Sequence, residues 1–206
     1  MNVSLIYLYY NNLDAINNLK LNNVNRLPFR KIFIDDASAE PLELDSSWTN
    51  TLVVRMLNDV QWNMSNANNV AVSFVDTEFF VRMDIDHFFD NEEIIDFFSS
   101  YSLPDNSYKQ FKRPHKNRLK VKFPPNIILM KTQDFISLGG YDERFCGYYG
   151  YEDMEFIRRL DMSGYKCIRD EKPYIYTSSC STQGLDRSLD RNFLLFETIK
   201  NTGVPL

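Results

Sequence analysis

The order of the first three segments of the chain constrains the fold more than any other feature. Residues 3–9, VSLIYLY, are rich in the β-branched and aromatic side chains that strands favour. Residues 13–21 carry apolar side chains at helical spacing, and residues 31–34, KIFI, return to strand character. A strand, a helix and a second strand in this order favour a parallel sheet with right-handed crossovers.

The rest of the chain continues to alternate between the two patterns. We predict helices over residues 50–69, 91–100, 132–138, 152–163 and 187–200, and strands over 70–75, 79–83 and 126–130. Residues 104–122 are rich in Lys, Arg, Asn and Pro, so we expect a long surface loop there. Because no second domain boundary is visible, we predict one α/β domain over residues 1–206, with a mostly parallel central sheet flanked by helices.

Composition excludes several classes of protein. Of the 206 residues, 44% are hydrophobic and 15% aromatic, which is enough to build one sizeable core. The formal net charge of −5 argues against nucleic acid as the main partner. Three cysteines without metal-ligand spacing argue against a disulfide framework. The apolar run near the start is too short to span a bilayer and lacks the flanks of a signal peptide, so we expect a cytoplasmic protein without membrane insertion.

Acidic pairs follow two of the predicted strands. Asp35 and Asp36 come after the second strand, and Asp84 and Asp86 come directly after residues 79–83. Since residues two apart in an extended segment project to the same side, Asp84 and Asp86 would face one point. Their oxygens suit Mg²⁺ or Mn²⁺ bound jointly with a phosphate group, and ligands bind at this edge of open α/β sheets. Each pair alone is also compatible with a turn or a helix cap, but two acidic strand ends in one sheet favour a nucleotide site.

A third segment combines paired glycines, tyrosines and acids. Gly139 and Gly140 would let the backbone approach a ligand closely. Glu152 and Asp153 begin a predicted helix, whose dipole is expected to keep their carboxylates ionised. A general base needs that ionised state at neutral pH, although an acidic pair here is equally compatible with a simple cap.

Taken in order, these segments resemble the GT-A-fold glycosyltransferases. The shared pattern is Asp-Asp-x-Ser, Asp-x-Asp, Gly-Gly-Tyr-Asp-Glu-x-Phe and Gly-Tyr-Glu-Asp, and it extends from residue 3 to residue 167. The chain is most similar to family two and to the C-terminal part of the β-galactosyltransferase group. The most specific block is residues 126–159, NIILMKTQDFISLGGYDERFCGYYGYEDMEFIRR. The short chain also resembles the minimal glycosyltransferase domains of large algal viruses, which would act in the host cytoplasm.

The resemblance implies a hexosyl- or deoxyhexosyltransferase that moves a sugar from a nucleotide-sugar, a UDP-sugar in most relatives, to a hydroxyl of a glycan acceptor. Tyr10 and Asp36 match the positions that hold the base of the donor. Asn69 would shape the donor site, and the turn of Gly139 and Gly140 would lie against the donor sugar. The nucleotide-binding part would then cover about residues 1–100 and the acceptor side about residues 123–206.

The resemblance also implies a metal site and a base. Asp84 and Asp86 match the residues that contact the ribose and the Mn²⁺ or Mg²⁺ that bridges the diphosphate. Asp153, with Glu152 as the alternative, matches the acid that deprotonates the acceptor hydroxyl in inverting members. The basic residues within 109–122 form either a solvated loop or a flap over the diphosphate.

The chain departs from this pattern in its histidines. Many relatives carry a metal-binding His after the Glu-Asp helix, whereas His87 and His115 both precede it here. His87 is either a metal ligand or an ordinary helix-entry residue. The missing late His leaves open a non-catalytic domain that binds a sugar or a protein. A sugar-phosphate nucleotidylyltransferase is disfavoured because residues 9–13, YYNNL, lack a Gly-rich basic loop, and a phosphohydrolase is disfavoured because His87 and Phe88 follow Asp-x-Asp.

Overall fold

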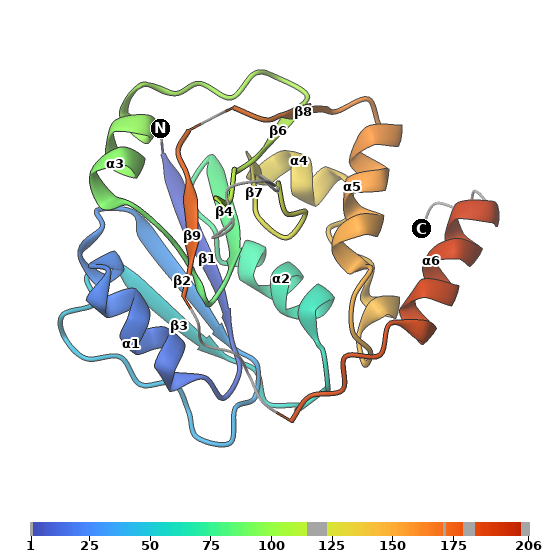
Figure 1. Ribbon diagram of the computed structural model, residues 1–206, viewed down its shortest axis with the longest axis horizontal. Coiled ribbons are helices and arrows are strands. Elements are labelled where there is room, and N and C mark those ends of the chain that lie inside the picture. The colour runs from blue at the N-terminus through green and yellow to red at the C-terminus, as the bar shows by residue number, and fades with distance from the viewer. Residues whose placement is uncertain (1, 115–122, 171, 179–183, 203–206) are drawn as a thin grey trace.

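The computed structural model describes residues 2–114, 123–170, 172–178 and 184–202 (Figure 1). A seven-stranded sheet with the order β3-β2-β1-β4-β7-β6-β8 forms its centre. Its strands are β1 (Val3–Tyr9), β2 (Arg30–Asp35), β3 (Thr51–Arg55), β4 (Phe79–Asp84), β6 (Ser107–Gln110), β7 (Ile128–Lys131) and β8 (Lys166–Ile168). A smaller sheet pairs β5 (His87–Phe89) with β9 (Ile175–Thr177).

The central sheet is mostly parallel, as predicted. β3, β2, β1 and β4 run in one direction, and β6 and β8 are parallel to each other. β7 is antiparallel to both of its neighbours, β4 and β6, and so reverses the direction of the sheet at one position. The α/β class and the mostly parallel sheet are therefore confirmed.

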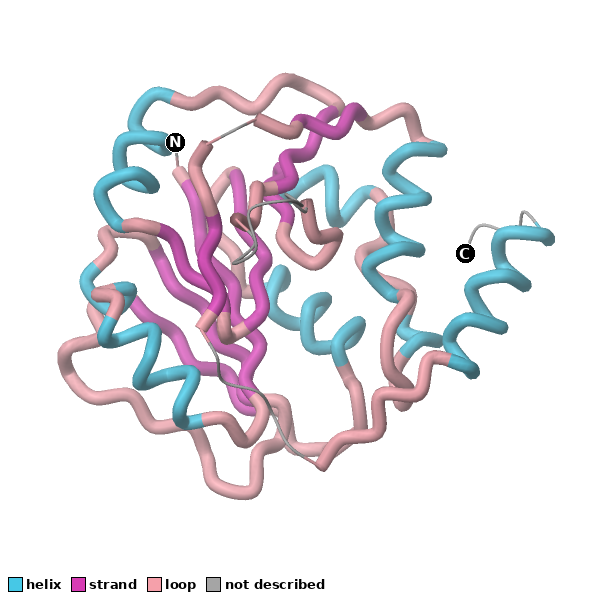
Figure 2. Tube along the Cα trace, viewed as in Figure 1, coloured by secondary structure: helices cyan, strands magenta, loops and turns pink. Residues whose placement is uncertain are grey.

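Helices cover both faces of this sheet (Figures 1 and 2). The helical elements are α1 (Leu13–Leu21), η1 (Val24–Arg26), α2 (Met64–Ser73), α3 (Asn91–Ser100), α4 (Thr132–Ser137), η2 (Glu143–Phe145), α5 (Glu152–Met162) and α6 (Asp190–Thr202). α1 and α3 pack with Leu5 and Tyr7 of β1 on one face. α2, α4 and α5 pack with Ile6 and Leu8 on the other. Successive side chains of β1 thus point alternately into two separate hydrophobic cores, as expected for a strand that is buried on both faces.

Residues 50–75 fold differently from the prediction. The predicted helix over 50–69 contains β3, and the predicted strand over 70–75 lies mostly within α2. Thr51–Arg55 carries a β-branched run that pairs with β2 at the edge of the sheet. In α2, Ala67 and Ala71 lie one turn apart on the face that packs against the sheet, so the apolar residues near 70 belong to a helix.

The predicted loop over 104–122 is wrong for residues 107–110, which form the buried strand β6. Lys109 lies in this strand with a fully buried side chain. Its Nζ donates to Asp170 at 2.8 Å and lies 5.4 Å from the ring centre of Phe97. These contacts compensate the buried charge, which is why a polar sequence can occupy the sheet. The part of the predicted flap at 115–122, including His115, lies outside the described residues.

Two further features concern the described helices and the cysteines. Among the described helices, none combines the length and the apolar character needed to cross a bilayer. Cys146 and Cys167 are free thiols, and Cys180 lies outside the described residues.

Candidate active site

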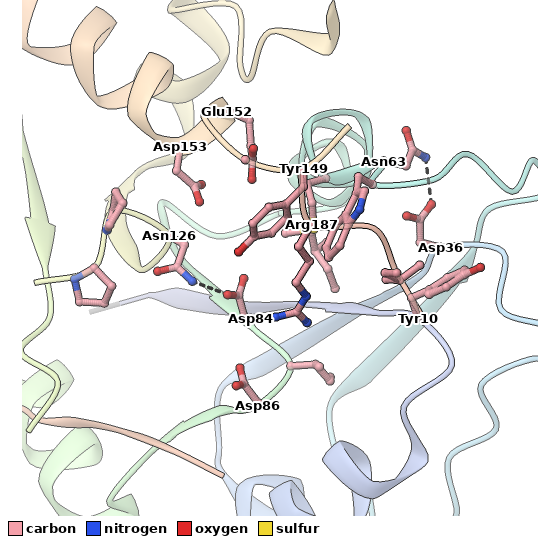
Figure 3. Close-up of a pocket in the computed structure, with 18 of the residues that line it drawn as sticks. Tyr10, Asp36, Asn63, Asp84, Asp86, Asn126, Tyr149, Glu152, Asp153 and Arg187 are labelled. Carbon is pink, nitrogen blue, oxygen red and sulfur yellow. Dashed lines mark hydrogen bonds between the residues drawn. The ribbon is translucent and has the colours of Figure 1, made fainter. Parts of the chain in front are cut away.

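A cavity of about 830 Å³ opens at the carboxyl edge of the central sheet (Figure 3). Because β1, β2 and β4 are parallel, the residues that follow them meet at this one edge. The segment before α2, the segment before β7 and the start of α5 form the other walls, and residues 185–189 complete the lining.

The cavity gathers most of the predicted site residues but not all of them. Six of the nine line it, namely Tyr10, Asp36, Asp84, Asp86, Glu152 and Asp153. Asn69, Gly139 and Gly140 are absent from its lining as the described residues define it.

Those three residues instead join α2 to the turn that precedes η2. Asn69 Oδ1 accepts the backbone N–H of Tyr141 at 2.8 Å, and Asn69 Nδ2 donates to the Tyr141 carbonyl at 3.0 Å. A Cβ at Gly140 would lie 2.4 Å from Asn69 Oδ1, so only glycine allows this approach. Asn69 and Gly140 thus make a structural contact outside the cavity lining, and the predicted contact of Asn69, Gly139 and Gly140 with a donor stays a prediction.

One end of the cavity carries a buried carboxyl group. Asp36 Oδ1 accepts a hydrogen bond from Asn63 Nδ2 at 2.9 Å, and Tyr10 lies beside it in Figure 3. Burial raises the pKa of Asp36 to about 6, although the hydrogen bond from Asn63 opposes that shift. The adjacent Asp35 has a structural role, because it accepts hydrogen bonds from two backbone N–H groups and from Arg55. Only Asp36 of this acidic pair is therefore available to a ligand.

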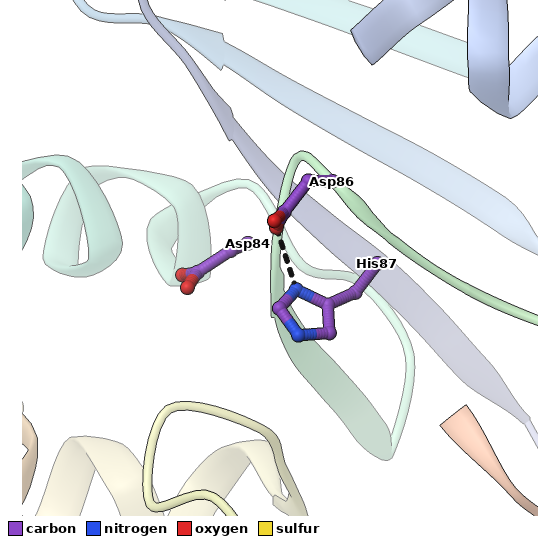
Figure 4. A group of neighbouring side chains, drawn as sticks. All are labelled: Asp84, Asp86 and His87. Carbon is purple, nitrogen blue, oxygen red and sulfur yellow. Dashed lines mark ion pairs between the residues drawn. The ribbon is translucent and has the colours of Figure 1, made fainter. Parts of the chain in front are cut away.

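Three neighbouring side chains of types that can ligate a metal, Asp84, Asp86 and His87, line the cavity (Figure 4). One ligand atom each from Asp84, Asp86 and His87 lies within 4.8 Å of the others. Within the described part of the chain, Asp84 Oδ1 and His87 Nδ1 are buried without a hydrogen-bond partner, although His87 Nδ1 lies 2.7 Å from Asp86 Oδ1. Two carboxylates and an imidazole suit Mn²⁺, so the residues present fit a divalent cation. His87 begins β5 and does not enter a helix, which corrects the structural alternative considered for it.

Glu152 and Asp153 line another part of the cavity, at the first turn of α5. Burial raises the pKa of Glu152 to about 8, and the charge of Asp153 acts in the same direction. Burial also raises the pKa of Asp153, against the lowering effect of Arg82. The loss of water therefore opposes the effect of the helix dipole at both groups, and the prediction that the dipole keeps them ionised stays a prediction.

Arg82 lies beneath this part of the cavity and was not predicted as a site residue. Its side chain is 1% exposed, and Nη1 lies 3.1 Å from Asp84 Oδ1 and 3.7 Å from Asp153 Oδ1. Nε donates to Asn68 Oδ1 at 3.1 Å. The sequence signal was a charged residue inside the otherwise apolar run of β4, two positions before Asp84.

Comparisons with known proteins agree with this fold. Residues 110–179 match the family model described as the N-terminal domain of galactosyltransferase. Over 89% of its length the chain superimposes on 58% of the mannosyltransferase PcManGT from Pyrobaculum calidifontis, solved in complex with GDP-Man and Mn²⁺, with a TM-score of 0.65 and 19% identity. The chain has the GT-A glycosyltransferase fold. The predicted resemblance to this group is thereby confirmed.

A second GT-A relative gives a similar picture. S. aureus TarS, residues 1–349, matches 87% of this chain over 61% of its own length, with a TM-score of 0.60 and 17% identity. The chain thus spans less than two thirds of the length of each of these solved structures. A search of curated proteins found no match.

The GT-A domain also places an aromatic pair and an arginine at the cavity. The rings of Trp62 and Tyr149 lie 4.6 Å apart, and the Arg187 guanidinium lies 5.7 Å and 5.8 Å from their centres. The Trp62 indole N–H donates to the carbonyl of Asp186, which fixes residues 185–189 against the wall. Sequence reasoning missed these residues because their positions, 62, 149 and 187, are brought together only by the fold.

A buried asparagine of α6 forms hydrogen bonds with residues 145–150, which precede α5. Asn192 Nδ2 donates to the carbonyls of Phe145, Tyr148 and Gly150 at 2.8–3.0 Å. The side of α6 that carries Asn192 therefore holds residues 145–150, while the rest of α6 stands away from the sheet (Figure 1). The segment that leads into Glu152 and Asp153 is positioned in this way.

Proposed function

We propose that this chain is a metal-assisted glycosyltransferase that moves a sugar from a nucleotide-sugar, with a UDP-sugar as the first candidate, to a hydroxyl of a glycan acceptor. The observation that carries the proposal is that one cavity is lined by three acidic groups: Asp36, the cluster of Asp84, Asp86 and His87, and the pair of Glu152 and Asp153. A base, a diphosphate and an acceptor would need groups of these kinds around one cavity. In this proposal residues 1–100 contribute mainly the donor side and residues 123–206 the acceptor side.

The base of the donor would bind at Asp36. A carboxylate oxygen accepts from the ring N–H of a pyrimidine or purine base, and Asn63, which donates to Asp36 Oδ1 and to Met56 Sδ, holds this carboxylate in place. An acceptor of this kind suits the ring N–H of uracil. PcManGT was solved with GDP-Man, so guanine is the alternative to test.

Asp84, Asp86 and His87 would hold the divalent cation. When bound, such an ion stabilises the negative charge that develops on a departing nucleoside diphosphate without a proton transfer. Asn126 Nδ2 donates to Asp84 Oδ2 and so orients this carboxylate toward the cavity.

Asp153 would accept the proton of the acceptor hydroxyl, with Glu152 as the alternative. The raised pKa values of both groups make them stronger bases than a solvated carboxylate, and a base is most effective when its pKa lies near the working pH. A positioned general base contributes about 10²–10⁴-fold to the rate.

The first test is thermal unfolding with UDP or GDP, each with and without Mn²⁺. A ligand at about 100 times its Kd stabilises a protein by about 2.7 kcal/mol, or about 5–10 °C for a chain of this size. We expect a Mn²⁺-dependent shift with UDP that is lost in Asp84→Asn and kept in Asp96→Asn, an exposed control on α3. No shift with either nucleotide would contradict the proposal.

The second test is turnover. Wild type and Asp153→Asn are compared for nucleotide release from UDP-glucose, UDP-galactose and GDP-mannose, with p-nitrophenyl glycosides as acceptors. We expect Asp153→Asn to bind nucleotide as wild type does but to lose about 10²-fold or more in transfer. Nucleotide binding without turnover in the wild type would favour the non-catalytic alternative.

A further inference from the structure

Arg82 is a charged group buried beneath the cavity, and it is held from two sides. Nε donates to Asn68 Oδ1 of α2, and Nη1 donates to the carbonyl of Asn126. Asn68 is itself buried and donates to the Met64 carbonyl within the same helix. These two hydrogen bonds hold the guanidinium in position.

The contacts of Arg82 with the two cavity acids are of another kind. The nearest oxygens, Asp84 Oδ1 at 3.1 Å and Asp153 Oδ1 at 3.7 Å, lie within ion-pair distance. Counting only the described residues, both oxygens and Arg82 Nη2 are buried atoms that lack a hydrogen-bond partner. Buried polar atoms are nearly always hydrogen-bonded, so three such atoms on facing charged groups require an explanation. One guanidinium here lies within ion-pair distance of two carboxylates, but it makes a hydrogen bond to neither of these oxygens.

We propose that Arg82 is a positioning residue that couples the donor side of the site to the acceptor side. It interacts with both Asp84 and Asp153, and its interaction shifts toward Asp153 when a cation binds Asp84. This inference rests on the proposed function. A divalent cation on Asp84 would offset the attraction between that carboxylate and Arg82, since both cations compete for one anion. Arg82 then interacts more strongly with Asp153 and holds it for the acceptor hydroxyl. Binding of the donor with its cation thereby prepares the acceptor side.

Three substitutions test this role. In Arg82→Lys the charge remains, but a single ammonium group cannot span two carboxylates as a guanidinium can. In Arg82→Met the competing charge is removed. Arg159→Lys is the matched control, because Arg159 also bridges an acid, Glu155, and backbone carbonyls from a largely buried position, but outside the cavity.

The readouts are Mn²⁺ affinity in the presence of UDP, measured by electron paramagnetic resonance, and the rate of nucleotide release with the donor that the wild type turns over. For Arg82→Lys we expect Mn²⁺ affinity within about threefold of wild type and a rate about 10²-fold lower, since a misplacement of about 1 Å can cost that much. For Arg82→Met we expect tighter Mn²⁺ binding, by about fivefold or more. Arg159→Lys should keep both quantities within about threefold, whatever its melting temperature.

Three results would overturn the inference. A rate in Arg82→Lys within threefold of wild type would remove Arg82 from this role. Weaker Mn²⁺ binding in parallel with the lost rate would indicate a purely structural arginine, and Arg82→Lys provides this result even if Arg82→Met does not fold. Failure of the wild type to bind either UDP or GDP with Mn²⁺ would instead contradict the proposed function, and this inference with it.

Discussion

Substituting Gly140 by alanine would break the contact that joins α2 to the turn before η2. Gly139 and Gly140 both have positive φ, +79° and +68°, where an L-residue costs about 1 kcal/mol or slightly more. At Gly139 an added Cβ meets nothing within 4 Å in the described part of the chain. At Gly140 it lies 2.4 Å from Asn69 Oδ1 and 3.1 Å from a ring carbon of Phe135. The two glycines therefore share the backbone strain and differ only in the clash.

The size of the difference follows from the hydrogen bonds that Asn69 must give up. Its side chain makes two bonds to the backbone of Tyr141, each contributing about 1 kcal/mol. We therefore expect Gly139→Ala to lower the free energy of unfolding by about 1 kcal/mol and Gly140→Ala by about 3 kcal/mol. For a chain of this length each kcal/mol corresponds to about 2–4 °C in melting temperature, so the expected losses are about 3 °C and about 9 °C.

The assay is urea and thermal unfolding of both variants, together with Asn69→Ala and the double variant Asn69→Ala/Gly140→Ala. Because Gly140→Ala and Asn69→Ala remove the same hydrogen bonds, their costs should add to less than the sum. Equal costs for Gly139→Ala and Gly140→Ala, or strict additivity in the double variant, would refute this reasoning. Nucleotide binding by Gly139→Ala should stay close to wild type, since Gly139 does not line the cavity as described.

Four further substitutions, at three positions, test buried polar groups. Because the pKa of Asp36 in the folded state is raised to about 6, its contribution to stability is present below pH 4 and is lost as pH rises through 6. At pH 8 the Asp36→Asn variant should therefore be more stable than wild type by up to about 3 kcal/mol. A lower stability of this variant at pH 8, measured by urea unfolding, would contradict the expectation. Arg55→Ala leaves the fully buried Asp35 without its cation and should cost about 3 kcal/mol, whereas Arg55→Lys should cost less. Asn192→Ala removes the bonds to three carbonyls of residues 145–150 and should cost about 2 kcal/mol, with faster hydrogen exchange in that segment; unchanged exchange would argue against the tether.

The parts of the fold that the sequence predicts well are those with an unbroken local pattern. The predicted bounds of β1, α1 and α3 agree with the structure, because each is a single periodic run ended by polar residues. The prediction for α2 was wrong because its apolar residues near position 70 are consecutive in the sequence, which masks their helical spacing. The prediction for β3 was wrong because a helix was expected over the whole of residues 50–69. β6 was missed for a tertiary reason, since the partner that compensates Lys109, Asp170, lies far along the chain.

The candidate site divides in the same way. Asp36, Asp84 and Asp86 could be placed at one edge because each lies at or just after the end of a parallel strand, and topology alone brings such residues together. The rise in the pKa of Glu152 could not be predicted, because it depends on burial by segments distant in sequence. Arg82 illustrates the same limit, since its second acid, Asp153, is 71 positions away.

The reversed direction of β7 places the segment before it, residues 123–126, in the wall of the cavity. The length of this segment can therefore change without changing the strand pairing of the sheet. In a parallel strand, the residues that lead in would lie at the opposite edge; here they arrive beside the end of β4, where Asn126 contacts Asp84. Residues 123–126, which form this part of the cavity wall, precede β7 and are not paired with a strand within the described residues, so no strand register fixes their length. Insertions or deletions before β7 could reshape the acceptor side of a chain with this topology while every strand pairing is kept.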